Sequence, residues 1–300
     1  MSNKLLIAIV GPTAVGKTAV AINLAEELHT EIVSADSRQF YREMEIGTAK
    51  PTAEELKKVP HHFINNLSIH DEYNAGKYEK EAVTCLAKLF EKHDKIILVG
   101  GSGLFIDALC NGFDELPEAD LKLRERYEDV LKNEGISALQ QELQSKDPDY
   151  YNEVDKNNPR RLIRALEVIN QTGLPYSQIR KRKVAQRDFA IIKIGLNLDK
   201  EILRERIDKR VDDMLTAGWL DECKSLYEYR NLNALRTVGY TELFDFIAGK
   251  NDWETTVQNI KTNTWHYAKR QLTWFKKDKD IKWFYPTEIE AIQSHINNKS

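Results

Sequence analysis

The octapeptide GPTAVGKT at residues 11–18 constrains the fold of this chain more than any other feature. It matches the pattern G-x-x-x-x-G-K-[ST], in which glycines let backbone N–H groups turn toward phosphate oxygens at the start of a helix. The apolar run LLIAIV at residues 5–10 precedes it and is typical of a buried strand, and helical apolar spacing follows over residues 18–28. The sequence therefore predicts a phosphate-binding loop (P-loop) made of Gly11, Pro12, Thr13, Ala14, Val15, Gly16, Lys17 and Thr18.

Two side chains of this loop have predicted roles on a bound phosphate. Lys17 is expected to neutralise the outer phosphate, and the Thr18 hydroxyl to ligate Mg²⁺. Most P-loop sites that transfer phosphoryl groups also place an aspartate at the end of a second strand. The run KIILV at residues 95–99 is the obvious place, but Gly100-Gly101-Ser102-Gly103 follows it without a carboxylate. The motif thus predicts phosphate binding and weakens an ATPase interpretation.

Further strand and helix patterns predict an α/β fold. Short apolar runs at residues 31–35 and 95–99 read as strands, and residues 75–92 as an amphipathic helix between them. This alternation predicts a parallel sheet flanked by helices.

The pattern changes between residues 118 and 187, where charged helical stretches at 121–133, 136–145 and 159–172 replace the strands. The strand pattern resumes at 189–198, helices follow at 199–217 and 253–277, and a last short strand is expected at 281–285. We therefore expect a P-loop core of residues 1–117 and 188–300 and a helical insert of residues 118–187.

Composition limits the partners and the compartment. The chain has 44 Lys+Arg against 47 Asp+Glu, a net charge of −3, so a nucleic acid would have to bind at local basic patches. Three widely spaced cysteines form neither a zinc pattern nor a disulfide framework, which favours a reducing compartment. No segment approaches the ~20 apolar residues of a membrane span. A cytoplasmic monomer without a membrane anchor is expected.

A second candidate site follows the strand at residues 31–35. Asp36 begins the stretch DSRQ at the carboxyl end of that strand, and this edge of a parallel sheet faces the ligand crevice. Asp36 is thus expected beside the P-loop, although Asp36 or Ser37 as a helix cap explains the same residues. His61 and His62 are adjacent and point apart on a helix or strand, which argues against a shared metal.

A set of motifs in order resembles the tRNA dimethylallyltransferase family. These motifs are GPTAVGKT, SADSRQFYREMEIGTAKP, VPHH, LVGGSGLF, NPRRLIRALEV, RTVGY and KRQLTWF, and they span nearly the whole chain. The resemblance implies a P-loop core, a helical insert that grips the tRNA anticodon stem-loop, and an allylic diphosphate as donor. The implied reaction joins a dimethylallyl group to the N6 amine of the adenosine on the 3′ side of the anticodon, in tRNAs that read codons beginning with U.

The resemblance also implies roles for single residues. Asp36 takes the proton of the amine or orients it, Ser102 stands where the family often has Thr, and Arg236 resembles an arginine that contacts the diphosphate. With Lys17, these form the predicted catalytic set. The predicted tRNA contacts are Asp36, Ser37, Arg38, Gln39, Ser102, Arg124, Arg160, Arg161, Leu162, Ile163, Arg164, Lys269 and Arg270.

Basic residues gather at the places where tRNA is expected. Arg160, Arg161 and Arg164 share one side of a helix, because positions three and four apart are neighbours. Arg180-Lys181-Arg182-Lys183 forms a second cluster, and Lys269 and Arg270 accompany aromatic residues on the helix at 253–277. Such groups bind phosphates and stack on unpaired bases, although charge runs are also found on plain solvated faces.

Three other functions explain part of the pattern. A P-loop nucleoside or nucleotide kinase accounts for residues 11–18, with Arg204, Arg206 and Arg210 as a lid, but not for the basic insert. An adenylate isopentenyltransferase uses a free nucleotide as acceptor, and a non-catalytic RNA-binding module modifies no base. The basic helices of the insert favour a tRNA acceptor.

Overall fold

In the residues that the computed structural model describes, 4–114, 116–180 and 185–299, six parallel strands form one sheet. Their order across the sheet is β3-β2-β4-β1-β5-β6. β1 lies between β4 and β5, with Leu5 opposite both Lys95 and Ala190. The strands are β1 (Leu5–Val10), β2 (Ile32–Ser34), β3 (His61–His62), β4 (Lys95–Gly100), β5 (Ala190–Leu196) and β6 (Lys282–Phe284). Because all six strands are parallel, their carboxyl ends meet at the same edge of the sheet.

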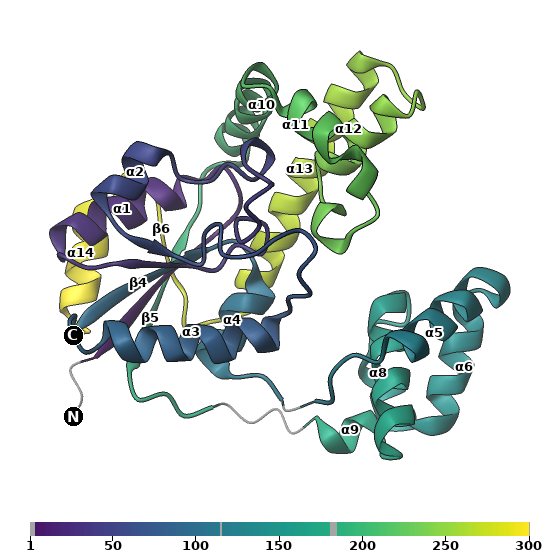
Figure 1. Ribbon diagram of the computed structural model, residues 1–300. Helices are drawn as coiled ribbons and strands as arrows, with labels where there is room; N and C mark the ends of the chain where they lie inside the picture. The colour runs from purple at the N-terminus through teal and green to yellow at the C-terminus, as the bar shows by residue number, and fades with distance from the viewer. Residues whose placement is uncertain (1–3, 115, 181–184, 300) are drawn as a thin grey trace. The chain divides into compact units, whose positions relative to one another are not determined.

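Helices cover both faces of this sheet (Figure 1). Alternate residues of β1 point to opposite faces, so Leu5, Ile7 and Ile9 join one buried cluster and the residues between them join another. α1 (Lys17–Glu27) and α14 (Ile289–Asn297) pack on the first face, and α3 (Ala75–Leu89) and α4 (Gly103–Asn111) on the second. The short helix α2 (Ala53–Lys58) begins at a capping box on Thr52.

A third buried cluster joins the helices beyond β5. These helices are α10 (Lys200–Thr216), α11 (Trp219–Leu226), α12 (Tyr240–Ile247) and α13 (Trp253–Phe275). The short 3-10 turns η2 (Tyr227–Tyr229) and η3 (Asn233–Leu235) lie among them, and η1 (Ile46–Thr48), from the segment after β2, packs against them. α13 contributes Ile260 to this cluster, Trp265 to the first and Phe275 to the second. One long helix therefore ties the third cluster to both faces of the sheet.

The chain divides into two compact units, Met1–Cys110 with Gln186–Ser300, and Asn111–Ala185. The second unit is helical in its described residues, with α5 (Leu121–Glu134), α6 (Ile136–Lys146), α7 (Pro148–Glu153), α8 (Pro159–Thr172) and α9 (Tyr176–Ile179). Its own buried cluster includes Tyr127, Leu139 and Leu162. α8 begins at Asn158, whose side chain accepts the Arg161 N–H, and ends at Gly173 in the left-handed region.

A buried carboxylate links α8 to α5 inside the second unit. Glu167 is fully buried. It accepts hydrogen bonds from the Asp120 N–H at 2.7 Å, Arg124 Nη2 at 3.0 Å and Arg164 Nη1 at 2.9 Å. Arg164 Nη2 also donates to the Pro117 carbonyl. A charge this deep is stable only when it is paired and hydrogen-bonded, so these contacts fix the start of α5 against α8.

The predicted fold class is confirmed. The predicted strand at residues 5–10 and the helix at 159–172 have the expected bounds, and the other predicted elements differ by one to three residues at one or both ends. β3 was not predicted, because two residues are too short for a pattern and become a strand only by pairing with β2. Among the described residues, no helix combines the length and apolar character needed to cross a membrane.

The Glu167 contacts lead to a stability prediction. Glu167→Gln keeps the shape of the side chain but removes the charge shared by the two guanidinium groups. We expect the second unit to lose about 1–3 kcal/mol of stability, the cost of weakening a buried charged hydrogen-bond network. Urea unfolding and hydrogen exchange of the α5 and α8 amides would measure this. Glu125→Gln, an exposed position on α5, is the control, and equal exchange in both variants would contradict the prediction.

Candidate active site

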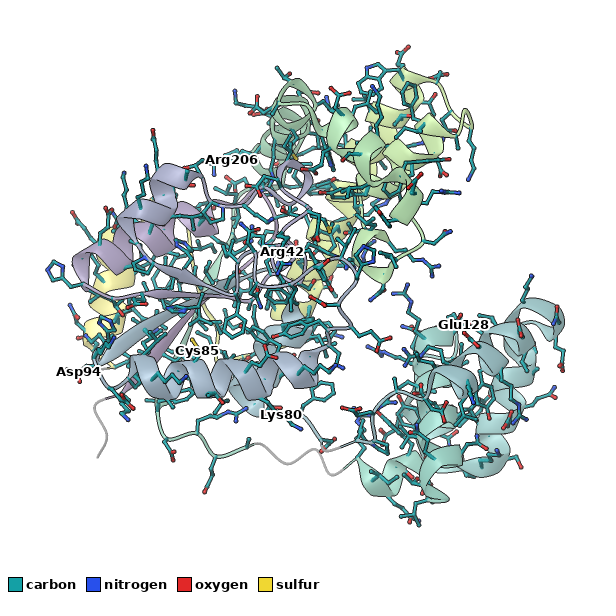
Figure 2. All side chains as sticks on the ribbon, in the orientation of Figure 1. Arg42, Lys80, Cys85, Asp94, Glu128 and Arg206 are labelled. Atoms are coloured by element: carbon teal, nitrogen blue, oxygen red, sulfur yellow. The ribbon has the colours of Figure 1, made fainter. Side chains whose placement is uncertain are left out.

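The P-loop lies between β1 and α1, where the sequence predicted it. Gly16 has φ +105°, a left-handed conformation that favours glycine, and it is the residue from which α1 starts. Lys17 Nζ donates a 2.7 Å hydrogen bond to the Pro12 carbonyl. Arg206, labelled in Figure 2, reaches over from α10 and donates to the Val15 carbonyl at 3.2 Å. The loop is thus held in shape by its own lysine and by an arginine of another helix.

Lys17 lies in an unusual electrostatic environment. The pKa of its ammonium group is lowered from 10.5 to about 7, chiefly by burial; the negative charge of Asp36 opposes this shift and the positive charge of Arg210 adds to it. Asp36 and Arg210 are therefore the charged neighbours of Lys17. A buried amine with this pKa gains its proton readily when an anion arrives beside it.

The chain around Asp36 forms a turn after β2. Asp36 Oδ1 accepts the Arg38 N–H at 3.0 Å, and the following residues form turns, so the alternative of a helix cap does not apply. Ser37 N–H donates to Ser102 Oγ at 3.0 Å, and Ser102 Oγ donates to Ser37 Oγ at 3.1 Å. Gln39 Nε2 donates to the carbonyls of Thr48 and Ala49. The loops after β2 and β4 are thus joined by hydrogen bonds.

Gln271, on α13, is a residue of this site that sequence reasoning missed. Its side chain is 6% exposed. Oε1 accepts the Thr13 N–H at 2.8 Å, and Nε2 donates to the Gly101 carbonyl at 2.8 Å. A β carbon on Gly101 would lie 2.4 Å from Nε2 and 3.7 Å from Lys17 Nζ, so a larger residue there would displace the amide. Its motif, KRQLTWF, stands out in the sequence, but no local pattern distinguishes the glutamine from its basic neighbours.

A pocket of about 90 Å³ opens beside Asp36. It receives side chains from the P-loop, from the loops after β2 and before α12, and from α10, α11 and α13. The lining residues are Thr13, Asp36, Arg38, Gly47, Thr48, Arg210, Val211, Met214, Trp219, Thr237, Val238, Thr264 and Tyr267. A titratable cluster that lines a concave pocket with a phosphate-binding loop is a candidate active site.

Arg210 and Tyr267 are two further members that the predicted catalytic set lacked. Burial raises the pKa of the Tyr267 phenol well above its usual value, and the charge of Asp36 raises it further, so the hydroxyl keeps its proton. Burial lowers the pKa of Arg210, and the charge of Asp36 counters this shift. Arg210 was considered only as part of a kinase lid, because three arginines on one charged helix cannot be told apart by pattern.

The predicted residues of the core divide into two groups. Thr13, Asp36 and Arg38 line the pocket, and Lys17 and Ser102 adjoin it through their contacts. Arg236 is exposed and does not line the pocket, although its neighbour Thr237 does.

The basic residues of α13 lie on its surface while its aromatic residues mostly pack inward. Lys269 Nζ lies 5.7 Å from the centre of the Trp265 ring, and Arg270 lies 6.0 Å from the Tyr267 ring. Trp274 Nε1 donates to Asp107 Oδ2 at 2.9 Å. The exposed lysine and arginine are available to phosphates, and the aromatic rings chiefly support the helix.

In the second unit, the predicted contacts differ in exposure. Arg160 and Arg161 are exposed, whereas the side chains of Leu162 and Ile163 are buried in the core of this unit. Arg124 and Arg164 are paired with Glu167. Arg180 lies 3.9 Å from Glu153, and residues 181–183 of the same basic cluster lie outside the described residues.

His61 and His62 lie on β3 and contact different partners. His61 Nδ1 is 2.8 Å from the Val59 carbonyl, and His62 Nε2 is 2.6 Å from Glu31 Oε2. Within the described residues, no group of three His, Cys, Asp or Glu side chains is arranged to hold a metal ion.

Comparison with known proteins gives matches over the whole chain. The chain is 49% identical to a tRNA dimethylallyltransferase of Christiangramia forsetii, covering 99% of this chain and 100% of that protein. It is 47% identical to one of Cytophaga hutchinsonii, covering 99% and 98%.

Solved structures match as well. The tRNA isopentenylpyrophosphate transferase of Bacillus halodurans is 36% identical with a TM-score of 0.73, covering 99% of this chain and 96% of that one. A eukaryotic dimethylallyltransferase acting on tRNA is 28% identical with a TM-score of 0.80, covering 99% and 77%. The family model described as IPP transferase matches residues 39–278. With this match over more than half of the sequence, and with near-full-length relatives far above 30% identity, the chain belongs to the IPP transferase family.

Proposed function

We infer that this protein is a tRNA dimethylallyltransferase, which transfers the dimethylallyl group of dimethylallyl diphosphate to the N6 amine of an adenosine in tRNA. The observation that carries this inference is a P-loop whose lysine interacts electrostatically with Asp36, a carboxylate that lines the adjoining pocket, while β4 ends without the carboxylate of a phosphoryl-transfer site. The names of the relatives, tRNA dimethylallyltransferases, agree with it. The acceptor we propose is the adenosine on the 3′ side of the anticodon, in tRNAs that read codons beginning with U.

The P-loop would hold the diphosphate of the donor. Its backbone N–H groups and the start of α1 attract the anion, Lys17 takes up a proton as the phosphates approach, and Arg210 supplies a forked guanidinium in the same pocket. Arg236 lies next to a pocket residue in the chain and remains a candidate at the rim.

Mg²⁺ fits the donor set only as an ion shared with the substrate. The Thr18 hydroxyl, in the first turn of α1, would supply one oxygen ligand, and the described residues offer no group of three His, Cys, Asp or Glu side chains for a fully protein-bound ion. Mg²⁺ commonly keeps several waters and binds through one or two protein groups plus substrate phosphates. When bound, the ion would neutralise charge that develops on the departing diphosphate.

Asp36 would act on the acceptor. The N6 nitrogen attacks the first carbon of the allyl group, the bond from this carbon to the diphosphate oxygen breaks, and the N6 proton passes to the Asp36 carboxylate. Ser37, Ser102 and the Arg38 N–H hold the turn that carries Asp36. The adenine must leave its stack to reach a pocket of this kind, as bases do in other base-modifying enzymes.

The tRNA itself would bind through exposed basic residues. Lys269 and Arg270 on α13, and Arg160 and Arg161 on α8, are exposed and can contact phosphates. We propose that the unit Asn111–Ala185 binds the anticodon stem-loop. Arg124 and Arg164 would contribute mainly through Glu167, by holding α5 and α8 together.

The function is tested with unmodified tRNA, dimethylallyl diphosphate and Mg²⁺, followed by mass spectrometry of the nucleosides. We expect wild type to form N6-(dimethylallyl)adenosine and Asp36→Asn to lose about 10²–10⁴-fold in single-turnover rate, because an amide cannot take the proton. Asparagine can still accept the Arg38 N–H, so tRNA affinity should change little. Stoichiometric ADP from ATP would instead indicate a kinase, and a wild-type rate in the variant would remove Asp36 from the mechanism.

The environment of Lys17 leads to a prediction about pH and stability. The folded protein releases the Lys17 proton near pH 7 and the unfolded chain near pH 10.5, so between these values the unfolded state binds one more proton. The contribution of Lys17 to the free energy of unfolding is therefore lowest below pH 7. It rises between pH 7 and 10.5, by at most about 1.4 kcal/mol per pH unit. Urea unfolding without ligand at several pH values should show this rise for wild type relative to Lys17→Met. Parallel pH curves for the two proteins would contradict it.

The exposed arginines of α8 lead to a prediction about salt dependence. Arg160→Ala with Arg161→Ala should weaken tRNA binding and make the plot of log affinity against log salt shallower by about 0.9 per lost phosphate contact. Arg164 is left intact because it holds Glu167. Filter binding at several salt concentrations measures the slope, and Lys57→Ala with Lys58→Ala, on the exposed side of α2, is the charge-matched control. An unchanged slope would assign Arg160 and Arg161 to a solvated face.

A further inference from the structure

One wall of the pocket is apolar, and the proposed chemistry does not by itself explain it. Val211, Met214, Trp219 and Val238 line the pocket together with the polar residues around Asp36. Val211 and Trp219 belong to the third buried cluster, whereas Thr13 and Asp36 follow β1 and β2 at the edge of the sheet. Met214 lies one helical turn beyond Arg210 on α10, on the same side of the helix. The pocket thus combines charged residues at the edge of the sheet with an apolar wall.

The Trp219 ring is a rigid part of this apolar wall. The side chain is 3% exposed. A β carbon on Gly47 would lie 2.1 Å from Trp219 Nε1, and one on Gly239 would lie 1.9 Å from Trp219 Cη2. The indole therefore packs directly against the backbone at two positions where only glycine leaves room for it. The Tyr240 ring packs edge-on against it, with centroids 5.7 Å apart.

The neighbours of Trp219 are themselves fixed by one carboxylate. Glu222 accepts hydrogen bonds from the Tyr240 hydroxyl at 2.6 Å and from the N–H groups of Ile46 and Gly47 at 2.7 and 3.1 Å. Both the Gly47 backbone and the Tyr240 ring, which pack against the indole, are held in place. The wall therefore has little freedom to move away from a longer ligand.

The size of the pocket matches a short hydrocarbon chain. Its volume is about 90 Å³. For comparison, an apolar cavity of about 150 Å³ in another protein binds benzene, a six-carbon molecule. On this scale, about 90 Å³ is a tight space for a five-carbon allylic group and far too small for a ten-carbon group, so the longer group would have to displace lining side chains such as Trp219 or Met214.

We propose that Trp219, supported by Met214, limits the length of the allylic chain that the enzyme accepts from its diphosphate donor. This inference rests on the proposed function, since it assumes that the P-loop holds the donor. Trp219 acts as a specificity-determining residue and takes no part in the proton transfer.

The test compares dimethylallyl diphosphate with geranyl diphosphate as donors to unmodified tRNA, for wild type, Trp219→Leu and Met214→Ala. We expect wild type to use only the five-carbon donor efficiently. In each variant the ratio of kcat/KM for the ten-carbon donor to that for the five-carbon donor should rise at least about tenfold, the scale of discrimination by apolar pocket contacts. Mass spectrometry of the nucleosides identifies the group transferred.

Leu243→Ala is the matched control, because Leu243 is fully buried in the same cluster but does not line the pocket. It weakens the core without enlarging the pocket and should leave the donor ratio unchanged. Circular dichroism and thermal melting establish which variants are folded, and Met214, only half-buried, decides the outcome if Trp219→Leu does not fold.

The outcomes separate the two proposals. If wild type transfers no dimethylallyl group, the proposed function fails. If wild type transfers it but accepts the ten-carbon donor equally well, or the folded variants keep the wild-type donor ratio, the role of Trp219 is overturned while the proposed function stands.

Discussion

The side-chain amide of Gln271 joins the two loops on which the candidate site depends. Because one amide carries both an acceptor and a donor, it binds the Thr13 N–H and the Gly101 carbonyl together. These loops follow β1 and β4, neighbouring strands whose carboxyl ends meet at the edge of the sheet. Gln271 comes from α13, which packs on all three buried clusters of its unit, so the spacing of the loops is set by the whole core.

Glu222 plays a comparable part on the other side of the pocket. Its carboxylate accepts three backbone N–H groups, those of Glu45, Ile46 and Gly47, in addition to the Tyr240 hydroxyl. Four hydrogen bonds to one carboxylate offset the cost of placing Glu222 beside the third buried cluster, which is apolar. They also bring the segment after β2, which is far away in sequence, against α11 and α12. The chemistry at Asp36 and the apolar wall at Trp219 are thereby parts of one pocket.

In the second unit, Glu167 divides the arginines into two kinds. Arg124 and Arg164 neutralise a buried charge, while Arg160 and Arg161 project from the first turn of α8. The four look alike in sequence, since each is a basic residue on an amphipathic helix. Only the position of the buried Glu167 carboxylate, two turns along α8 from Arg160, shows which of these arginines have a partner within the protein.

Local sequence patterns predict those parts of the protein whose structure depends on near neighbours in the chain. The P-loop, the buried strands β1 and β4, the bounds of α8 and the place of Asp36 at a strand end all follow from short-range periodicity and motif spacing. The ordered motifs also predicted the family to which the chain belongs. Tertiary structure alone decided which residues meet across long sequence separations. Gln271, Arg210, Tyr267 and Trp219 join Asp36 and the P-loop because helices beyond residue 200 pack on the sheet, and packing of this kind leaves no periodic signal in the chain.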